Sequence, residues 1–332
     1  MKSYPALLLF FCLMLAGSSI FTLGSGETAW QLVWEGSLLR IKALSEAWNP
    51  LLDERLPRLI VLLCTGASLA VSGAVIQSLF HNPLASPSVL GISSGGCLIV
   101  VLVFIFDLHN AHPYILPLSA FLGCLATLCL VYNLSRFQRG DRVTNLVLTG
   151  VAVSTLIIAV QGLLLYAMRD NWQLIQTVTE WESGSSIDRG WQHVHMQLPL
   201  TIIGLLGCWR YRQEMNILTL GEEEAKNLGV EVKKVRWRLF LFISLLTGGA
   251  LAGLGLVAFF GLVLPHIIRR LQGPNHFCLI PLCMLGGAAV LTSLDILLRF
   301  FNLHALSIGN FSALIGGTFF LALLFNPQRQ KI

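Results

Sequence analysis

Apolar segments recur along the whole chain, and short polar stretches separate them. Three of the clearest are "ALLLFFCLMLAGSSIFTLG" (6–24), "LIVLLCTGASLAVSGAVIQSLF" (59–80) and "IPLCMLGGAAVLTSLDILL" (280–298). A helix needs about 20 apolar residues to cross a bilayer, so the pattern predicts an all-α polytopic membrane protein. We place about ten transmembrane helices, near 5–23, 58–79, 89–106, 114–134, 145–167, 195–210, 239–255, 257–268, 279–299 and 308–325. No segment stands apart as a soluble domain, so residues 1–332 are predicted to form one transmembrane domain.

The first apolar segment has two interpretations. Lys2 precedes an apolar core and small residues follow it, as in a signal peptide. We favour a retained first helix, because the apolar run continues through "IFTLG" and nine more hydrophobic segments follow.

The orientation follows from the basic residues of the polar stretches, which are enriched on the cytoplasmic side of membrane proteins. With the N-terminus inside, the inner stretches hold 15 Lys and Arg and the outer stretches hold seven. Acidic residues show the opposite bias, with ten outside and six inside. The charges therefore predict that both termini are cytoplasmic, and they leave residues 24–54 as an outer loop.

Residues 239–268 test this topology, because basic residues bound the segment on both sides. Two full helical crossings need about 40 residues, and only 30 are present. We therefore expect one helix and then an extended or broken return through "GGALAGLGLVAFFGLVLP". Irregular backbone at membrane depth occurs only where protein buries it or where it lines a cavity, and broken helices are common in transporters.

A second irregular stretch, "HNPLASPSVLGISSGG" (81–96), follows the second predicted helix. Its prolines stop the helix, and its glycines permit close backbone approach. The stretch is either a tight cytoplasmic turn followed by small-residue helix packing or a gate at the inner mouth of a pathway. The sequence favours neither.

The longest inner polar stretch spans residues 212–238. Within it, "TLGEEEAKNLG" predicts a short helix with an acidic first turn, which suits the helix dipole, and a glycine at its end. Leu220, Ala225 and Leu228 can fall on one face of this helix, while its glutamates and Lys226 look outward. The stretch is either a solvated connector or a docking surface for a soluble partner, and its length favours the second.

Composition agrees with a membrane protein, since 55% of the residues are hydrophobic and only 12% are charged. The eight cysteines all lie in apolar stretches without a CxxC pair, so we interpret them as small buried hydrophobes rather than disulfide or metal sites. The chain has no GxxxxGK[ST] motif and is not predicted to hydrolyse ATP. No cofactor, metal or nucleic acid is expected to bind this chain.

Several blocks in order resemble the FecCD-type permeases, the membrane subunits of ABC importers for iron–siderophore complexes, haem and cobalamin. These blocks are "RLPRLIVLLCTGASLAVSGAVIQSLFHNPLASPSVLGISSGG" (55–96), "LVLTGVAVS" (146–154), "WESGSSIDRGW" (181–191), "LTLGEEEAKNLGVEV" (218–232), "FFGLVLPHIIRRLQGPNH" (259–276) and "LDILLR" (294–299). The resemblance covers essentially residues 50–326.

The resemblance implies a type II (cobalamin-importer-like) permease in a bacterial inner membrane. It further implies a second permease subunit, as a homodimer or a related pair, two cytoplasmic ATP-binding subunits and an extracytoplasmic substrate-binding protein.

Three groups of residues carry over from the family to matching positions here. The predicted docking site for glutamates of the binding protein comprises Arg55, Arg58 and Arg299. The predicted cytoplasmic gate comprises Asn82, Leu84, Val143 and Thr144. The predicted ATPase-coupling surface comprises Leu220, Gly221, Glu222, Ala225, Leu228 and Gly229.

The physical chemistry of the outer arginines agrees with docking. Arg55 and Arg58 are three residues apart, which places them on adjacent helix surface, and an arginine binds carboxylates bidentately. Their alternative role is to anchor the helix at the membrane surface. Asp295 lies four residues before Arg299, and we expect the two to pair rather than to relay protons.

The chain also departs from the family pattern. Glu182 stands where an apolar residue is usual, and Ser307 and Thr318 replace prolines. Two other classes of function are alternatives. An ion-coupled secondary transporter usually buries acidic or histidine relays in mid-membrane, and here Asp295 is the only acidic residue within a predicted span. An intramembrane enzyme is disfavoured because no HExxH motif occurs. His193 and His195 are interpreted as surface or packing histidines with ordinary hydrogen-bond partners rather than as catalytic residues.

Overall fold

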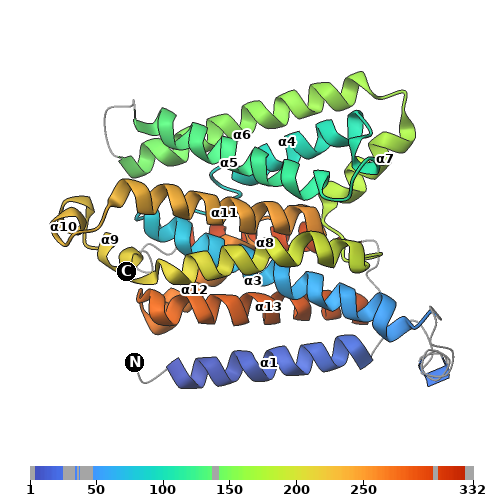
Figure 1. Cartoon of the computed structure of the whole chain (residues 1–332), viewed down its shortest axis with the longest axis horizontal. Coiled ribbons are helices and arrows are strands. Elements are labelled where there is room, and N and C mark those ends of the chain that lie inside the picture. The colour runs from blue at the N-terminus through green and yellow to red at the C-terminus, as the bar shows by residue number, and fades with distance from the viewer. Residues whose placement is uncertain are drawn as a thin grey trace.

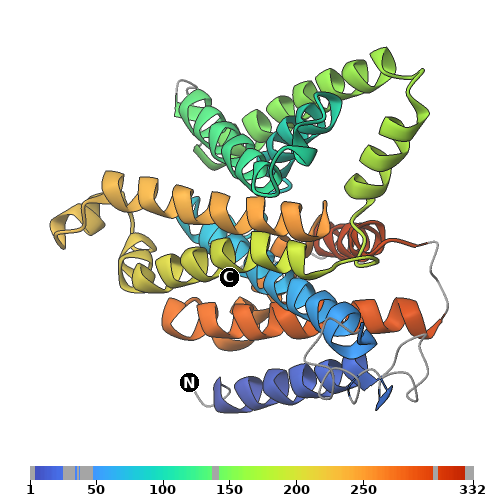
Figure 2. The same cartoon turned by 45° about the vertical axis from the view of Figure 1, so that its right-hand side comes forward.

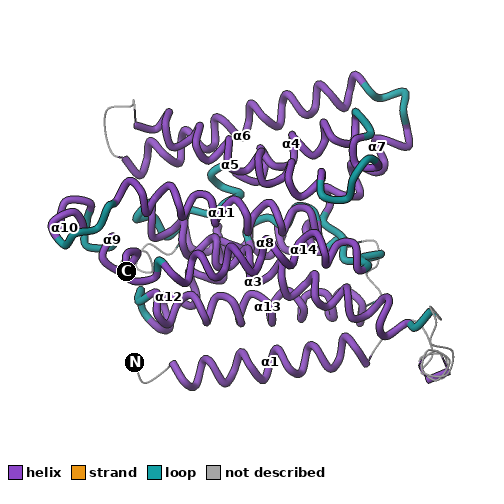
Figure 3. The backbone as a smooth tube through the Cα atoms, in the orientation of Figure 1, coloured by secondary structure: helices purple, strands orange, loops and turns teal. Residues whose placement is uncertain are grey.

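The computed structural model describes residues 4–24, 34–35, 37, 48–136, 142–301 and 306–325. Within these ranges the chain consists of helices and loops and contains no strand (Figure 3). The helices are α1 (Tyr4–Gly24), the π-helix η1 (Pro50–Arg55), α3 (Leu56–Leu79), α4 (Ile92–Ile105), the 3-10 helix η2 (Leu108–Asn110), α5 (Ile115–Arg136), α6 (Arg142–Ala167), α7 (Trp172–Ser183), α8 (Trp191–Arg210), α9 (Arg212–Leu218), α10 (Glu222–Asn227), α11 (Val232–Leu254), α12 (Phe260–Gln272), α13 (His276–Phe300) and α14 (Ile308–Leu324).

Every predicted span coincides with a helix, so the all-helical membrane fold is confirmed, but the number of crossings is not. Six helical stretches are long and apolar enough to cross a bilayer, and α4 and α14 contain shorter apolar helices. The remaining two predicted spans correspond to α8 and α12. Helix α8 opens on the polar sequence "WQHVHMQ", and α12 has only 13 residues.

The long helices lie side by side, and the described ends of the chain fall at the same end of the bundle as α9 and α10 (Figure 1). We call this the inner end, because the charge bias predicts it to be cytoplasmic. The opposite end carries η1 and α7, and we call it the outer end. Most of the chain's outer loop 24–54 lies outside the described residues.

Helix α3 forms the centre of the fold, where it packs against α13, α11, α8 and α12. Paired glycines allow two of these crossings. A Cβ on Gly66 would lie 2.2 Å from the carbonyl oxygen of Gly287 in α13, and a Cβ on Gly73 would lie 1.7 Å from that of Gly261 in α12. Small residues at crossings let helix backbones approach closely, which is how helices associate when lipid removes the hydrophobic driving force.

Helices α4, α5 and α6 contact one another and join the rest of the bundle mainly through α11. Figure 2 shows them as a group on the opposite side of α11 from α1. Helix α6 has few neighbours. In its most apolar stretch only 22% of the residues are buried, against 89% in that of the segment containing α3.

The predicted break in residues 239–268 is confirmed. Helix α11 ends at Leu254, five residues follow without helical structure, and α12 then begins at Phe260. Two residues turn the chain in the left-handed region, Gly255 with φ of 90° and Phe259 with φ of 60°. Positive φ is unusual for a bulky residue such as phenylalanine, so the surrounding packing must hold this turn in place.

The stretch 81–91 is largely buried and is not a surface turn. Ala85, Ser86 and Leu90 are fully buried. A Cβ on Gly150 of α6 would touch the backbone of Leu90, and the Phe259 N–H donates to the Ser88 hydroxyl. This loop therefore packs against both α6 and the break before α12.

Cysteine packing agrees with the sequence interpretation at most positions. All eight cysteines, which fall within the described ranges, are free, and five of them are buried. Cys12 on α1 is exposed, because α1 contacts the bundle along only one face.

Candidate functional site

A cap holds the start of η1, which continues directly into α3, and this segment carries two of the predicted docking arginines. The Asn49 side chain accepts hydrogen bonds from the Leu51 and Leu52 N–H groups, at 2.9 and 3.3 Å. The Asp53 carboxylate accepts one from the Asn49 N–H at 2.7 Å. This reciprocal arrangement satisfies donors at the helix start that would otherwise lack partners. Arg55 ends η1, and Arg58 follows in the first turn of α3.

Arg58 and Arg299 share one carboxylate, that of Asp295. Arg58 donates to Asp295 Oδ1 at 2.7 Å, across the α3–α13 crossing. The Arg299 Nε lies 3.1 Å from Asp295 Oδ2, one helical turn along α13. The Asp295 side chain is 1% exposed, whereas the two arginines are 18% and 19% exposed. The expected pairing of Asp295 with Arg299 is therefore confirmed, and Arg58 joins it.

The Asp295 cluster also receives a residue from the loop between α7 and α8. The Ser186 hydroxyl donates to Asp295 Oδ1 at 2.5 Å and accepts from Arg58 at 2.7 Å. These contacts join α3, α13 and the loop at the outer end.

Arg55 lies apart from the Asp295 cluster and is only 3% exposed. It donates to the carbonyl of Leu23 at the end of α1, at 2.9 Å. In this conformation Arg55 ties α1 to the start of α3. Its predicted contact with a binding protein stays a prediction.

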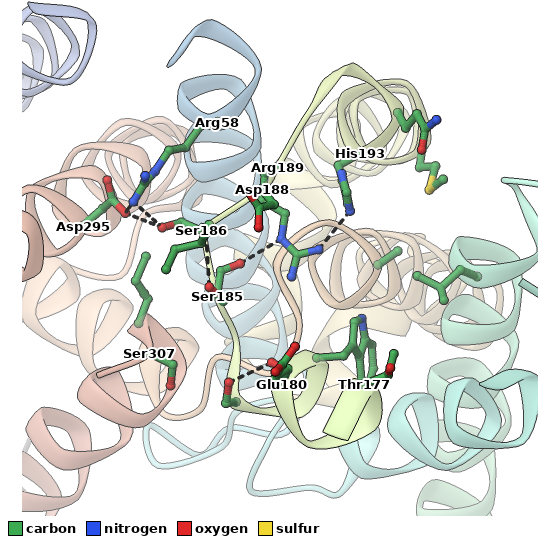
Figure 4. A pocket seen from close by; sticks show the side chains of 18 of the residues that line it. Arg58, Thr177, Glu180, Ser185, Ser186, Asp188, Arg189, His193, Asp295 and Ser307 are labelled. Atoms are coloured by element: carbon green, nitrogen blue, oxygen red, sulfur yellow. Dashed lines mark hydrogen bonds and ion pairs between the residues drawn. The ribbon is translucent and has the colours of Figure 1, made fainter. Parts of the chain in front are cut away.

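A cavity of about 920 Å³ opens beside these arginines at the outer end. Residues from α3, α7, α8, α13 and the α7–α8 loop line it, and all three predicted docking arginines are among them. Figure 4 shows Arg58 and Asp295 on one side of this cavity and Arg189 and His193 on another.

Arg189 is a functional candidate that sequence reasoning missed. Its Nε donates to the Ser185 carbonyl at 2.8 Å, and its NH1 lies 2.9 Å from His193 Nε2. Burial and the neighbouring arginine lower the pKa of His193 to about 4, so the ring is neutral and accepts this hydrogen bond. Two signals were available: Arg189 lies within the block 181–191 that resembles the family, and it is an outer basic residue, against the charge bias.

The predicted gate is described in part. Asn82 is buried, and its side chain accepts from the Leu84 N–H at 2.9 Å, which forms a local turn. Val143 and Thr144 lie in the first turn of α6, but their side chains are outside the described structure. The gate as a whole therefore stays a prediction.

The predicted coupling helix is present as α10 (Glu222–Asn227), with Gly221 before it and Gly229 after it, both at positive φ. The three residues of the predicted apolar face differ in burial, and their docking role stays a prediction. Ala225 is buried, but Leu220 and Leu228 are 62% and 61% exposed. The helix is too short to bury all three against the bundle, so two large apolar side chains remain exposed at the inner end.

Glu222 was expected to point outward, but it is turned toward α11. It is half-buried and pairs with Arg236 of α11, which in turn donates to the Tyr132 hydroxyl at 2.7 Å. This ion pair fixes α10 against α11.

A buried polar network at the inner end was not foreseen. His276, at the start of α13, is fully buried. Its ring nitrogens lie 2.5 Å from the Ser78 hydroxyl of α3 and 2.7 Å from Asn216 Oδ1 of α9. Arg269 of α12 donates to the same Ser78 hydroxyl at 3.1 Å. The network joins α9, which leads into α10, to three helices of the bundle.

Glu182, one of the departures from the family pattern, accepts a hydrogen bond from Gln161 of α6. The contact links α7 to α6, so the polar substitution has a polar partner. Among the described residues no three His, Cys, Asp or Glu side chains gather where they could hold a metal ion.

Comparison with known proteins finds similarity across the chain. The model of the FecCD transport family matches residues 7–326. The hemin transport system permease protein HmuU of Yersinia pestis is 36% identical, over 98% of each chain. The Fe(3+) dicitrate transport system permease protein FecD of Escherichia coli is 34% identical, over 96% of this chain and 98% of its own. A protein described as a metal-chelate type ABC transporter in an inward-facing conformation superposes with a TM-score of 0.80 and 30% identity, over 97% of this chain and 99% of its own.

Proposed function

Since this chain belongs to the FecCD transport family, we propose that it is the permease subunit of an ABC importer that carries an iron–siderophore-type chelate, haem or cobalamin. Family members are subunits that carry solute through the membrane and are not themselves enzymes, and they are multi-pass proteins of the bacterial inner membrane. In the proposed importer, this chain pairs with a second permease subunit. Two cytoplasmic ATP-binding subunits supply the energy, and an extracytoplasmic protein delivers the cargo.

The observation that carries the proposal is the polarity of the molecule along its axis. The outer end holds a cavity lined by arginines, and the inner end holds a short helix with exposed leucines at 220 and 228. Exposed large apolar side chains beside charged neighbours are typical of a protein–protein contact. The two ends therefore suit two different partners, one anionic on the outside and one with an apolar groove on the inside.

Force transfer from the ATP-binding subunits has a physical route. A partner that moves α10 also moves α9, and Asn216 of α9 is hydrogen-bonded to His276 of α13. His276 connects onward to α3 through Ser78. We propose that this contact carries the motion of the coupling helix into the transmembrane helices.

The alternative, an ion-coupled secondary transporter, has less support. Asp295 is held by two arginines and a serine. A proton relay needs a path to the carboxylate, but the Asp295 side chain is 1% exposed and both of its oxygens face arginines.

The test is reconstitution with the native partners. The tagged chain is purified from its own membrane with the subunits that accompany it, and the complex is placed in liposomes. Uptake of labelled ferric siderophore, haemin or cobalamin should require ATP and the substrate-binding protein. Uptake by the chain alone, driven by a proton gradient, would instead establish the secondary transporter.

A point variant sharpens the test. Leu228→Glu places a charge on the proposed docking surface, and the ATP-binding subunits should no longer co-purify. Asn227→Glu, at the preceding residue, is the matched control, because it also replaces an exposed neutral side chain with a negative charge. If both variants lost the ATP-binding subunits equally, the overall charge of this surface, and not the apolar contact, would control their association with the chain.

A further inference from the structure

The wall of the outer cavity carries an excess of positive charge in its buried part. Four arginines and four carboxylates line the cavity: Arg55, Arg58, Arg189, Arg299, Glu54, Glu180, Asp188 and Asp295. All four arginines are buried or half-buried, whereas three of the carboxylates are exposed and only Asp295 is buried. Solvent and salt screen exposed charges far more than buried ones. An anion inside the cavity therefore meets guanidinium groups with little competition from the carboxylates.

Arg189 differs from the other arginines in its partners. Arg58 and Arg299 are already neutralised in part by Asp295, and Arg55 is bound to the Leu23 carbonyl. Within the described part of the chain Arg189 forms no direct ion pair, although the charge of the exposed Asp188 beside it acts on it, and its two hydrogen bonds go to neutral acceptors. A guanidinium has five N–H donors, so several donors of Arg189 remain for a ligand.

The neighbours of Arg189 fix its orientation. Ser185 holds Nε from the α7–α8 loop, and His193 holds NH1 from α8. Figure 4 shows the guanidinium between these two residues. Holding a guanidinium in place in advance lowers the entropy lost when it binds a ligand.

We propose that the outer cavity is a binding site for a small molecule that bears carboxylate groups, and that Arg189 is the residue that receives the carboxylate. The inference rests on the proposed function, because the small molecule is then the cargo, and it narrows the cargo to an anionic chelate. His193 is a positioning residue that acts through Arg189.

The experiment measures binding of citrate, a compact tricarboxylate, to the purified full chain in a neutral detergent. Isothermal titration and the fluorescence of Trp181, which lines the cavity, report binding. Citrate should bind saturably, and Arg189→Gln should weaken it at least tenfold. Arg189→Lys should fall between the two, because lysine keeps the charge but loses the bidentate geometry.

Two controls separate the site from general attraction. Arg169→Gln removes an exposed arginine near the same end of the bundle, and citrate affinity should not change. Glucose, a neutral polyol of similar size, should not bind. A thermal melt of each variant shows that the fold is intact, and Arg189→Lys serves if Arg189→Gln does not fold.

Several outcomes would overturn the proposal. Absence of saturable citrate binding does so, as does equal binding by the Arg189→Gln chain. A glutamate-rich peptide that binds while citrate does not would show that the carboxylate comes from a partner protein rather than from cargo. Failure of this proposal can be told apart from failure of the proposed function. If citrate binds but ATP-dependent uptake does not occur, the binding site stands and only the importer function is rejected.

Discussion

The two ends of the bundle both place polar side chains among apolar helices, but they do so in different ways. The outer cluster depends on one carboxylate, Asp295, which holds two arginines and a serine beside an open cavity. The inner network has several connections, because Ser78 and Asn216 each keep another hydrogen bond if His276 is lost. The outer cluster therefore depends on a single group, whereas the inner network joins four helices through several contacts.

The largest effect should come from removing the single carboxylate. Asp295→Ala leaves Arg58 and Arg299 half-buried without a counter-charge. Breaking a buried ion pair costs about 3–5 kcal/mol. We expect the low end of this range, because both arginines reach the water of the cavity and Arg58 keeps its bond to Ser186. Thermal unfolding of the purified chain in one detergent measures the change.

Asp170→Ala is the matched control for this variant. Asp170 is 98% exposed and lies 3.9 Å from Arg169, and exposed pairs contribute little to stability. Its melting temperature should match that of the unaltered chain. If the two aspartate variants melt alike, the Asp295 cluster does not stabilise the outer end.

A smaller effect is expected at the inner end. His276→Phe keeps a ring at the buried position but removes the hydrogen bonds to Ser78 and Asn216. Leaving a buried polar group without a partner costs about 1–3 kcal/mol. Because Ser78 and Asn216 retain other partners, we expect about 1 kcal/mol.

The functional consequence at His276 should exceed the consequence for stability. With the link from α9 weakened, ATP hydrolysis by the reconstituted complex should continue while uptake falls. His195→Phe, at an exposed position of α8, should change neither. A parallel fall of hydrolysis and uptake in the His276 variant would show that the network supports only the fold.

The comparison of the two ends also explains which features the sequence could predict. Hydropathy located every long helix, because lipid contact and burial both require apolar residues. Hydropathy could not predict which of these helices would be buried in the bundle. The stretch containing α3 and helix α6 are almost equally apolar, yet most of the first is buried and most of the second is exposed. The distinction lies in small residues such as Gly66 and Gly73, which allow helix crossings.

The site residues divide in a similar way. The family resemblance pointed to Arg58 and Arg299, and local spacing predicted the pairing of Asp295 with Arg299. Local spacing could not predict that Arg58 joins the pair, because 237 residues separate it from Asp295. The contact between Asn216 and His276 was missed for the same reason, since 60 residues separate them and Asn216 lies outside the blocks that resemble the family.

The smallest effect is expected where an ion pair is near the surface. Glu222 of α10 pairs with Arg236 of α11, but the glutamate side chain is 33% exposed. Solvent screening leaves such a pair about 0.5 kcal/mol, and Arg236 keeps its bond to Tyr132 when the charge is removed. Glu222→Gln should therefore lower the melting temperature slightly at low salt and not at all at high salt, where screening is short-ranged.

Glu223→Gln supplies the comparison for this last variant, because Glu223 is the next residue on the same helix and is exposed. It should leave the melting temperature unchanged at either salt concentration. If Glu222→Gln lowered the melting temperature as much as Asp295→Ala, and did so at either salt concentration, α10 would be anchored as firmly as the outer cluster. The coupling helix would then move only with the whole inner end, and not about its own contact with α11.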